Sequence, residues 1–190
     1  MPKLPRSFYQ LPAQQLAPQF LGKYLAFNSP KGRLSGKVVE VEAYPAFSDE
    51  VSHGNKRTAR TEVMYREGGY AYIYLVYGMY HQFAAVVNKK EVPEVVFIRA
   101  VIPDQGVEIM QHNFGRPVKS PLELTNSPGK LCKAFGMDRT LYGTDLTGDT
   151  LFFEDRGVTV SPAAVQTLPR VGISPRLAGH ALPLRFVLTG

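Results

Sequence analysis

The stretch that decides the fold is residues 68–80, GGYAYIYLVYGMY, which holds five of the ten tyrosines of the chain. β-favouring residues alternate here with a period of two, which predicts a β-strand. Tyr72 and Tyr74 then point to the same face of that strand. Gly78 permits the backbone reversal of a tight turn, and the residues after it should form the return strand. The stretch therefore predicts a hairpin with Tyr77 at its tip and a wall of tyrosine rings on one face. The alternative is a purely structural aromatic strand, because aromatic side chains mostly pack in cores.

A second strand is expected at residues 37–44, where the two faces differ in character. One face carries small apolar side chains, those of Val39, Val41 and Ala43. The other face carries two carboxylates and a phenol, those of Glu40, Glu42 and Tyr44. This second face is either a solvated sheet surface or the lining of a cleft that uses at least one carboxylate.

A third strand is expected at residues 95–101, where Arg99 should share a face with Val95, Phe97 and Val101. An arginine in an apolar strand needs a buried partner or a charged ligand, because unpaired burial is costly. A carboxylate is the natural partner. Glu42 is the best candidate, since the two groups would fix each other's geometry.

Local signals predict the remaining elements. Helical pieces interrupted at Pro18 come early in the chain, and a polar turn is expected at residues 29–36. A helix is expected over residues 103–114, with Asp104 as its N-cap. Further short strands are expected at residues 151–154, 159–161 and 184–188.

Two further segments carry basic residues. A polar segment without clear periodicity spans residues 45–67, and a loop of this length is usually functional or disordered. Its histidine, His53, would alone be more often a surface or hydrogen-bonding residue than a catalytic one. A second segment places Ser127 at the N-cap of a helix that starts at Pro128. Its free backbone N–H groups and Lys130 either form an anion site or belong to a helix that is simply well capped.

Composition limits the class of protein. The 190 residues are ordinary in apolar content, and we expect a single domain spanning residues 1–190. The net charge of +6 indicates an anionic partner, with nucleic acid considered before an acidic membrane. The single cysteine, Cys132, rules out an internal disulfide and a cysteine-rich metal site, and it favours a reducing compartment.

Missing motifs narrow the chemistry further. The sequence has no Walker loop, no G-x-G-x-x-G and no Cys/His metal spacing, so we expect no metal and no cofactor. It also has no apolar stretch of membrane-spanning length and no signal-peptide core, so we expect no membrane partner. The expected location is the cytoplasm, with association to the nucleoid if the source is bacterial.

Several segments, in order along the chain, resemble the alkyladenine (3-methyladenine, or methylpurine) DNA glycosylase family. They read VVEVEAY at 38–44, YIYLVYGMY at 72–80, FIRA at 97–100, SPGKL at 127–131 and RVGI at 170–173. The resemblance covers nearly the whole chain. It implies an α+β fold, a single mixed domain around a curved antiparallel β-sheet with peripheral helices. It also implies a monomer that acts on double-stranded DNA containing damaged purines and needs no cofactor.

The resemblance also implies roles for individual residues. In the catalytic set, Glu42 matches the family's general base, Arg99 matches an arginine that helps hold the catalytic water, and Val171 matches a residue whose backbone carbonyl contacts that water. In the base pocket, Tyr44 and Tyr74 match the aromatic rings that sandwich the flipped base, His53 contacts its edge, and Tyr72 supports the pocket. On the DNA side, Tyr77 matches the wedge that fills the gap in the duplex. Contacts to the DNA backbone are expected from Arg57, Arg60, Gly129 and Lys130.

One position departs from the family pattern. The family usually has an asparagine where this chain has Ala84, and that amide is thought to crowd the 2-amino group of guanine. Its loss should weaken discrimination, as in a pocket without a blocking group. We therefore expect better tolerance of guanine-derived or bulkier lesions. The competing expectation is reduced activity on neutral bases.

The residues themselves favour the same chemistry. An enzyme that acts on a stacked base must take it out of the helix, at a cost of a few kcal/mol. A carboxylate can then stabilise the positive charge that develops on the sugar and take a proton from water. The expected function is monofunctional hydrolysis of the N-glycosidic bond, which leaves an abasic site. Two alternatives stay open, a damaged-DNA-binding module without catalysis and a small-molecule hydrolase or RNA-binding β-domain.

Overall fold

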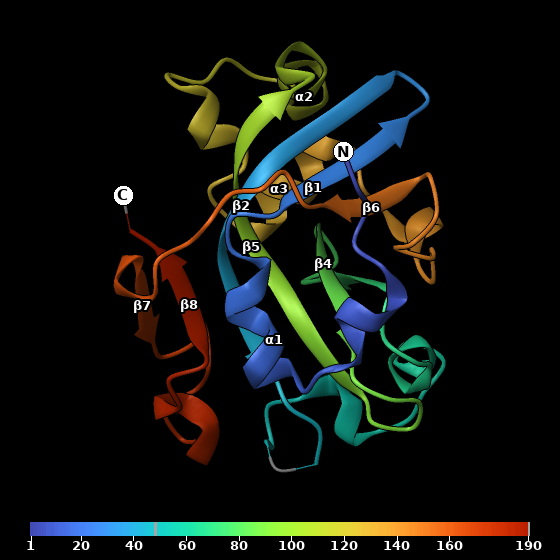
Figure 1. Ribbon diagram of the computed structural model, residues 1–190, viewed down its shortest axis with the longest axis vertical. Helices are drawn as coiled ribbons and strands as arrows, with labels where there is room; N and C mark the ends of the chain where they lie inside the picture. Colours follow the sequence, from blue (N-terminus) through green and yellow to red (C-terminus); the bar gives the residue numbers. More distant parts are fainter. Residues whose placement is uncertain (48, 190) are drawn as a thin grey trace.

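One antiparallel sheet runs through the molecule in the order β3-β4-β5-β2-β1-β6. The computed structural model describes residues 1–47 and 49–189 (Figure 1). The strands of this path are β1 (Tyr24–Ser29), β2 (Gly32–Tyr44), β3 (Ala71–Val76), β4 (Tyr80–Val87), β5 (Glu94–Gln105) and β6 (Leu151–Glu154). A separate hairpin, β7 (Val165–Leu168) and β8 (Arg185–Leu188), joins the sheet because β8 pairs with β2. The expected α+β class with an antiparallel sheet is confirmed.

Three short α-helices lie around the sheet in the described part of the chain, namely α1 (Ala13–Phe20), α2 (Val107–Phe114) and α3 (Pro128–Phe135). α1 packs against β2 and β5, whereas α3 packs against β4, β5 and α2. Single 3₁₀ turns connect the rest, at Arg6–Gln10, His53–Asn55, Glu62–Tyr65, Pro121–Leu124, Arg139–Leu141, Pro162–Ala164 and Ala178–Ala181. Within residues 1–47 and 49–189, no helix has the length and apolar character needed to cross a membrane.

The two faces of β3, β4 and β5 bury different sets of side chains. One face contributes to the main core, together with the apolar sides of all three α-helices. The opposite face forms a second cluster whose buried members are Val63, Met64, Tyr72, Ala84, Val86, Val95 and Phe97. The strand predicted from the period-two alternation is confirmed, because Ile73 lies in the main core while Tyr72 lies in the second cluster on the opposite face.

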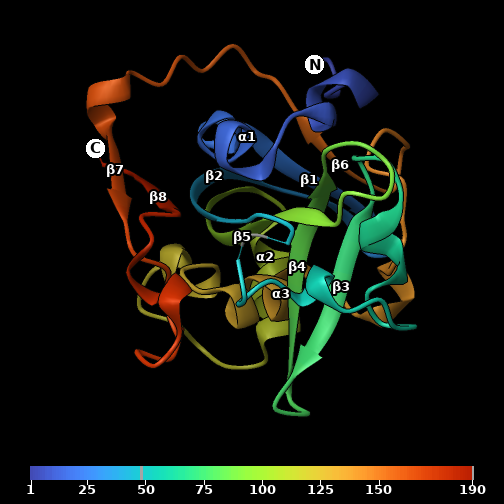
Figure 2. The same ribbon diagram turned by 90° about the horizontal axis from the view of Figure 1, so that it is seen from below.

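The predicted hairpin is confirmed. β3 pairs with β4 from Ala71↔Ala85 to Val76↔Tyr80, and the hairpin projects from the body of the molecule in Figure 2. Tyr77 and Gly78 have φ values of 52° and 68°, and the Met79 N–H donates to the Val76 carbonyl at 3.1 Å. Positive φ at both central positions is typical of a type I′ turn.

A double irregularity in the β2–β5 pairing changes two predicted faces. The register runs Val38↔Val101, Glu40↔Ala100 and Val41↔Ile98, so Val39 and Arg99 are each left without a partner. Val38 rather than Val39 consequently lies in the main core, and the expectation for Val39 is wrong. Val101 also lies in the main core and does not share the face of Arg99. A bulge of this kind re-aims a side chain, and here it re-aims Arg99.

Four element boundaries also differ from expectation. The helix at Pro18 is not interrupted, because α1 ends only two residues later and loses a single hydrogen bond. The turn after β1 is short and closes when Ser29 Oγ donates to the Gly32 carbonyl at 2.7 Å. Asp104 is not an N-cap but part of β5, and α2 starts after Gly106, whose φ is 77°. Residues 159–161 form no strand, because the pairing partner of β8 is the later segment β7.

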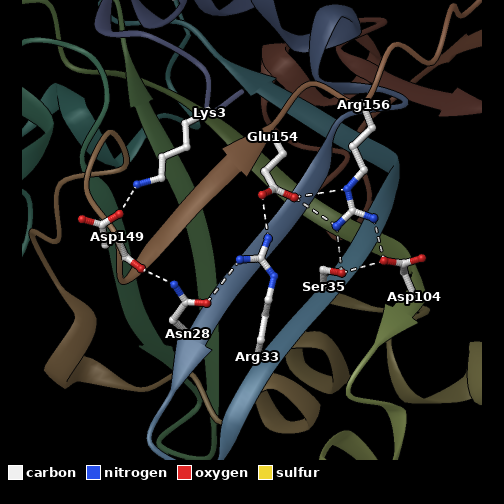
Figure 3. A network of polar contacts seen from close by, with 8 residues as sticks. All are labelled: Lys3, Asn28, Arg33, Ser35, Asp104, Asp149, Glu154 and Arg156. Carbon is white, nitrogen blue, oxygen red and sulfur yellow. Dashed lines mark hydrogen bonds and ion pairs between the residues drawn. The ribbon is translucent and has the colours of Figure 1, made fainter. Parts of the chain in front are cut away.

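A network of charged and polar side chains ties the chain's first residues to the sheet (Figure 3). Its members are Lys3, Asn28, Arg33, Ser35, Asp104, Asp149, Glu154 and Arg156. Arg156 is central, since it forms ion pairs with Asp104 at 2.7 Å and with Glu154 at 3.0 Å. The network connects β1, β2, β5 and β6 away from the second cluster.

Candidate active site

A pocket of about 360 Å³ opens over the second cluster. Its aromatic and polar walls come from Tyr44 on β2, His53, Tyr72 and Tyr74 on β3, and Phe97 on β5. The C-terminal segment closes the other side with Gly172, Ile173, Ser174 and Leu177, and Val51, Ala84 and Val95 complete the lining. This volume is near the lower end of the ~300–1,000 Å³ found for small-ligand sites, which suits one ring system rather than a chain.

The tyrosine wall is ordered by contacts among its own members. Tyr72 and Tyr74 stack with ring centroids 4.8 Å apart and an interplanar angle of 21°. His53 meets the Tyr74 ring edge-on at 5.0 Å, and its Nδ1 lies 3.2 Å from the Tyr72 hydroxyl. The Tyr74 hydroxyl donates to Gln82 Oε1 at 2.8 Å. The residues predicted for the base pocket are thus brought together.

Glu42 lies on β2 beside Tyr44, and its side chain has no exposed surface. The Val171 N–H donates to Glu42 Oε1 at 2.8 Å, and the Tyr44 hydroxyl donates to Oε2 at 3.0 Å. Glu42 does not line the pocket, but Tyr44 does, and so does Gly172, the neighbour of Val171. A ligand in the pocket would therefore contact Tyr44, whose hydroxyl binds the buried carboxylate, and Gly172, which follows Val171 in the chain.

Arg99 supplies the positive charge beside this carboxylate. Its Nη1 lies 3.2 Å from Glu42 Oε1, so the predicted pairing is confirmed. Its Nε donates to Glu40 Oε1 at 2.8 Å, a shorter contact that the pairing argument did not anticipate. The Arg99 side chain is only 13% exposed, so one guanidinium serves two carboxylates with little access to water.

Burial and neighbouring charges shift the pKa values of the site. Burial raises the pKa of Glu42, and Arg99, the Val171 N–H and the Tyr44 hydroxyl partly oppose that shift. Partial desolvation and the nearby Arg60 charge lower the pKa of His53. Burial raises the pKa of Tyr72 to about 12, so its hydroxyl keeps its proton at neutral pH. The site thus combines a neutral histidine and a protonated phenol with one carboxylate that ionises less readily than usual.

Arg170 is a site residue that the sequence argument did not single out. Its guanidinium lies over the Tyr44 ring at 4.6 Å and forms a buried ion pair with Asp49. It also donates to the carbonyls of Ala43 and Gly179, each at 3.2 Å. These contacts fasten the segment that carries Val171 to the end of β2. The sequence signal was the charged residue within an otherwise apolar turn.

The residues predicted to contact DNA lie around the hairpin. Tyr77 is 89% exposed, so no protein contact explains its left-handed backbone. Gly129 stands at the start of α3, where an added Cβ would come 3.3 Å from the Tyr80 side chain, so glycine allows close packing there. Lys130 donates to Asn126 Oδ1 at 2.9 Å. Their contacts to DNA stay predictions.

Two arginines of the segment before the hairpin differ in availability. Arg57 forms ion pairs with Glu62 at 2.7 Å and with Glu91 at 2.8 Å. Arg60 is exposed and has no ion pair within the described residues. Arg60 is therefore freer than Arg57 to meet an external anion.

No group of three or more His, Cys, Asp or Glu side chains in the described ranges is arranged to hold a metal ion.

Comparison with known proteins gives one consistent result. The family model for methylpurine-DNA glycosylase matches residues 7–190. A protein of Bacillus subtilis (strain 168) is 42% identical over 98% of this chain and 93% of its own length. A protein of Desulfitobacterium hafniense (strain Y51) is 37% identical over 99% of this chain and 96% of its own. Both carry the name "Putative 3-methyladenine DNA glycosylase".

Proposed function

The chain belongs to the methylpurine-DNA glycosylase family, and from this premise we propose that it removes alkylated purines from duplex DNA by hydrolysis. The damaged nucleotide rotates out of the helix, its base enters the pocket, and water cleaves the N-glycosidic bond. The product is an abasic site with an intact strand. The observation that carries this proposal is the buried carboxylate of Glu42 behind an aromatic pocket.

The pocket suits a flat, positively charged base. The rings of Tyr44 and Tyr74 line a cavity of about 360 Å³. An alkylated purine is cationic, and electron-rich rings favour a cation by about 0.5–2 kcal/mol. Tyr72 and the neutral His53 form the polar side of the wall, where they can meet the edge of the base.

Glu42 is the general base in this proposal. Breaking the bond between base and sugar develops positive charge on the sugar, and a nearby carboxylate stabilises it. The same carboxylate takes a proton from the attacking water. Burial raises the pKa of Glu42, and Arg99 and the Val171 N–H partly oppose that shift and fix the direction of the carboxylate. A cationic purine departs without further protonation, so this chemistry needs no second acid.

Tyr77 fills the space that the flipped nucleotide leaves. Its ring is 89% exposed at the turn of the β3–β4 hairpin, and this hairpin projects from the body of the molecule (Figure 2). Base flipping costs a few kcal/mol, and a stacked side chain offsets part of that cost. Arg60, Lys130 and the N-terminus of α3 approach the phosphates in this arrangement.

Release of free base from a defined duplex tests the proposal. The purified protein is incubated with duplexes that each carry one 3-methyladenine, 7-methylguanine or hypoxanthine. We expect free base from the 3-methyladenine and 7-methylguanine duplexes, and an alkali-labile strand that stays intact without alkali. A protein that binds these duplexes but never frees a base would instead be a damage-binding module. Strand cleavage without alkali would indicate a lyase step and contradict the monofunctional assignment.

A further inference from the structure

A network of polar contacts holds the Glu42 carboxylate, and we infer that Arg185 belongs to it as a positioning residue for Glu42, the proposed general base. This inference rests on the proposed function. Arg185 lies on β8 and stands opposite Glu42 in the β2–β8 register. The two side chains form no ion pair with each other among those of the described residues. Arg185 therefore acts on Glu42 through other groups, along two paths.

The first path runs through carboxylate and guanidinium groups. Arg185 Nη1 donates to Glu40 Oε1 at 3.1 Å. The same oxygen accepts from Arg99 Nε at 2.8 Å, which leaves Arg99 Nη1 directed at Glu42. Glu40 therefore anchors Arg99 at the bulge, and Arg185 keeps Glu40 in place and balances its charge.

The second path runs through the backbone. Arg185 Nε donates to the Pro169 carbonyl at 3.0 Å. Two residues later, the Val171 N–H donates to Glu42 Oε1. Arg185 thus holds the start of the segment that delivers this N–H. Two of the three groups that stabilise the Glu42 carboxylate, Arg99 and the Val171 N–H, are thus tied to the Arg185 guanidinium, and the third is the Tyr44 hydroxyl.

The side chain of Arg185 is suited to this double attachment. A guanidinium presents several N–H groups in a fixed fork, so it can serve two acceptors in two directions. Arg185 is 24% exposed, and Glu40 is 19% exposed, so the contact between them is partly shielded from water, whereas the contact to the Pro169 carbonyl lies at the surface. Lysine would keep the charge near Glu40 but could not hold both acceptors in this geometry.

The charged and titratable groups around Glu42 set the expected signs. They are Arg99 on β5, Glu40 and Tyr44 on β2, Tyr74 on β3, Arg170 beside Tyr44, and Arg185 on β8. Loss of the Arg185 charge leaves the negative charge of Glu40 without one of its two positive partners. It also frees the segment that carries the Val171 N–H. Both effects disfavour the ionised form of Glu42. Loss of the Glu40 charge removes a neighbouring negative group and favours that form.

The test measures single-turnover base release from a 3-methyladenine duplex between pH 4.5 and 8, at saturating protein. The rate of the wild type should fall as the pH drops through the pKa of Glu42. We expect Arg185→Gln to lower the rate at pH 7 about tenfold, with Kd for the duplex changed less than about threefold. The acid limb of its pH profile, which is the range where the rate falls as the pH drops, should move to higher pH. Arg185→Lys should recover part of the rate, and Glu40→Gln should move the acid limb to lower pH.

Arg156→Gln is the matched control. Arg156 also joins two carboxylates across the sheet, but it lies in the network of Figure 3, which does not reach Glu42. This variant should lower the melting temperature and leave the pH profile unchanged. A general loosening of the fold would instead move both arginine variants alike.

The outcomes separate the two claims. A folded Arg185→Gln protein with the wild-type rate and acid limb would overturn the inference and leave the proposed function standing. If Arg185→Gln does not fold, Arg185→Lys decides, because lysine keeps the charge near Glu40 but cannot hold both acceptors, and a wild-type rate and acid limb in that variant overturn the inference. A wild type that releases no base refutes the proposed function itself.

Discussion

Glu42 is an acid group with no exposed surface, and the proposed mechanism needs its ionised form to accept a proton. Burial opposes ionisation, and three contacts favour it, from Arg99, the Val171 N–H and the Tyr44 hydroxyl. The pKa of Glu42 stays above its usual value, so the general base that we propose titrates closer to neutral pH than an exposed glutamate does. The carboxylate could be predicted from sequence because Glu42 shares a strand face with Tyr44. Its partner could be predicted because Arg99 interrupts an apolar strand.

Ala84 lines the pocket with a side chain of only one methyl group. It lies between Tyr72 and Phe97 in the sheet and is 1% exposed. Ala84→Asn would fill part of the cavity, so we expect release of 7-methylguanine to fall several-fold relative to hypoxanthine. Competition between the two lesions in one reaction measures the ratio, with Ala84→Ser as the small polar control. An unchanged ratio would remove Ala84 from the specificity residues.

The β3–β4 hairpin carries a bulky residue in a conformation that favours glycine or asparagine. Tyr77 has a φ of 52°, and the left-handed region costs an ordinary residue roughly 1–2 kcal/mol. Tyr77→Asn should therefore leave thermal stability equal or higher, since Asn-Gly suits this turn. The same change should lower base release at least tenfold, because no ring remains to fill the duplex. Tyr77→Phe keeps the ring and should stay near the wild-type rate.

Two measurements check the hairpin prediction, the melting temperature and the single-turnover rate. A Tyr77→Asn protein that keeps the wild-type rate would show that the ring is dispensable. A clear drop in melting temperature would show instead that Tyr77 stabilises the hairpin through contacts with the protein.

At this scale the sequence predicts regular elements better than irregular ones. Alternation along residues 70–77 fixes a strand and its faces, and Ser127, Pro128 and Gly136 fix the ends of α3. The β2–β5 bulge is not visible in either strand alone, because a register shift depends on both partners. For this reason the faces of Val39 and Val101 were predicted wrongly while the pairing of Arg99 was not.

The molecule as a whole is basic, with a net charge of +6, and its basic residues are spread along the chain. Binding to DNA should weaken with salt, with a slope of log Kobs near −0.9 for each phosphate contacted. Arg60→Ala should reduce that slope by the amount that belongs to about one phosphate contact, and it should weaken binding to all DNA sequences alike. Arg57→Ala should change the slope less, because Glu62 and Glu91 already hold that guanidinium. Titrations at several salt concentrations test this, and equal slopes for Arg60→Ala and the wild type would contradict it.

Long-range contacts set the limit of the sequence argument for the whole molecule. The C-terminal segment closes the pocket because Arg170 reaches Asp49 and because β8 pairs with β2. These partners are more than a hundred residues apart, and nothing local links them. The resemblance implies that the Val171 carbonyl contacts the catalytic water, but only the fold shows that the Val171 N–H donates to Glu42.

The most direct test of the account is base release by Glu42→Gln, which keeps the size of the side chain and removes its charge. Single-turnover release from a 3-methyladenine duplex and Kd for the same duplex are measured side by side at pH 7. We predict a loss of release of at least a thousandfold, with Kd within a few-fold of the wild type. Release at more than a tenth of the wild-type rate, with the fold intact, would show that another group activates the water.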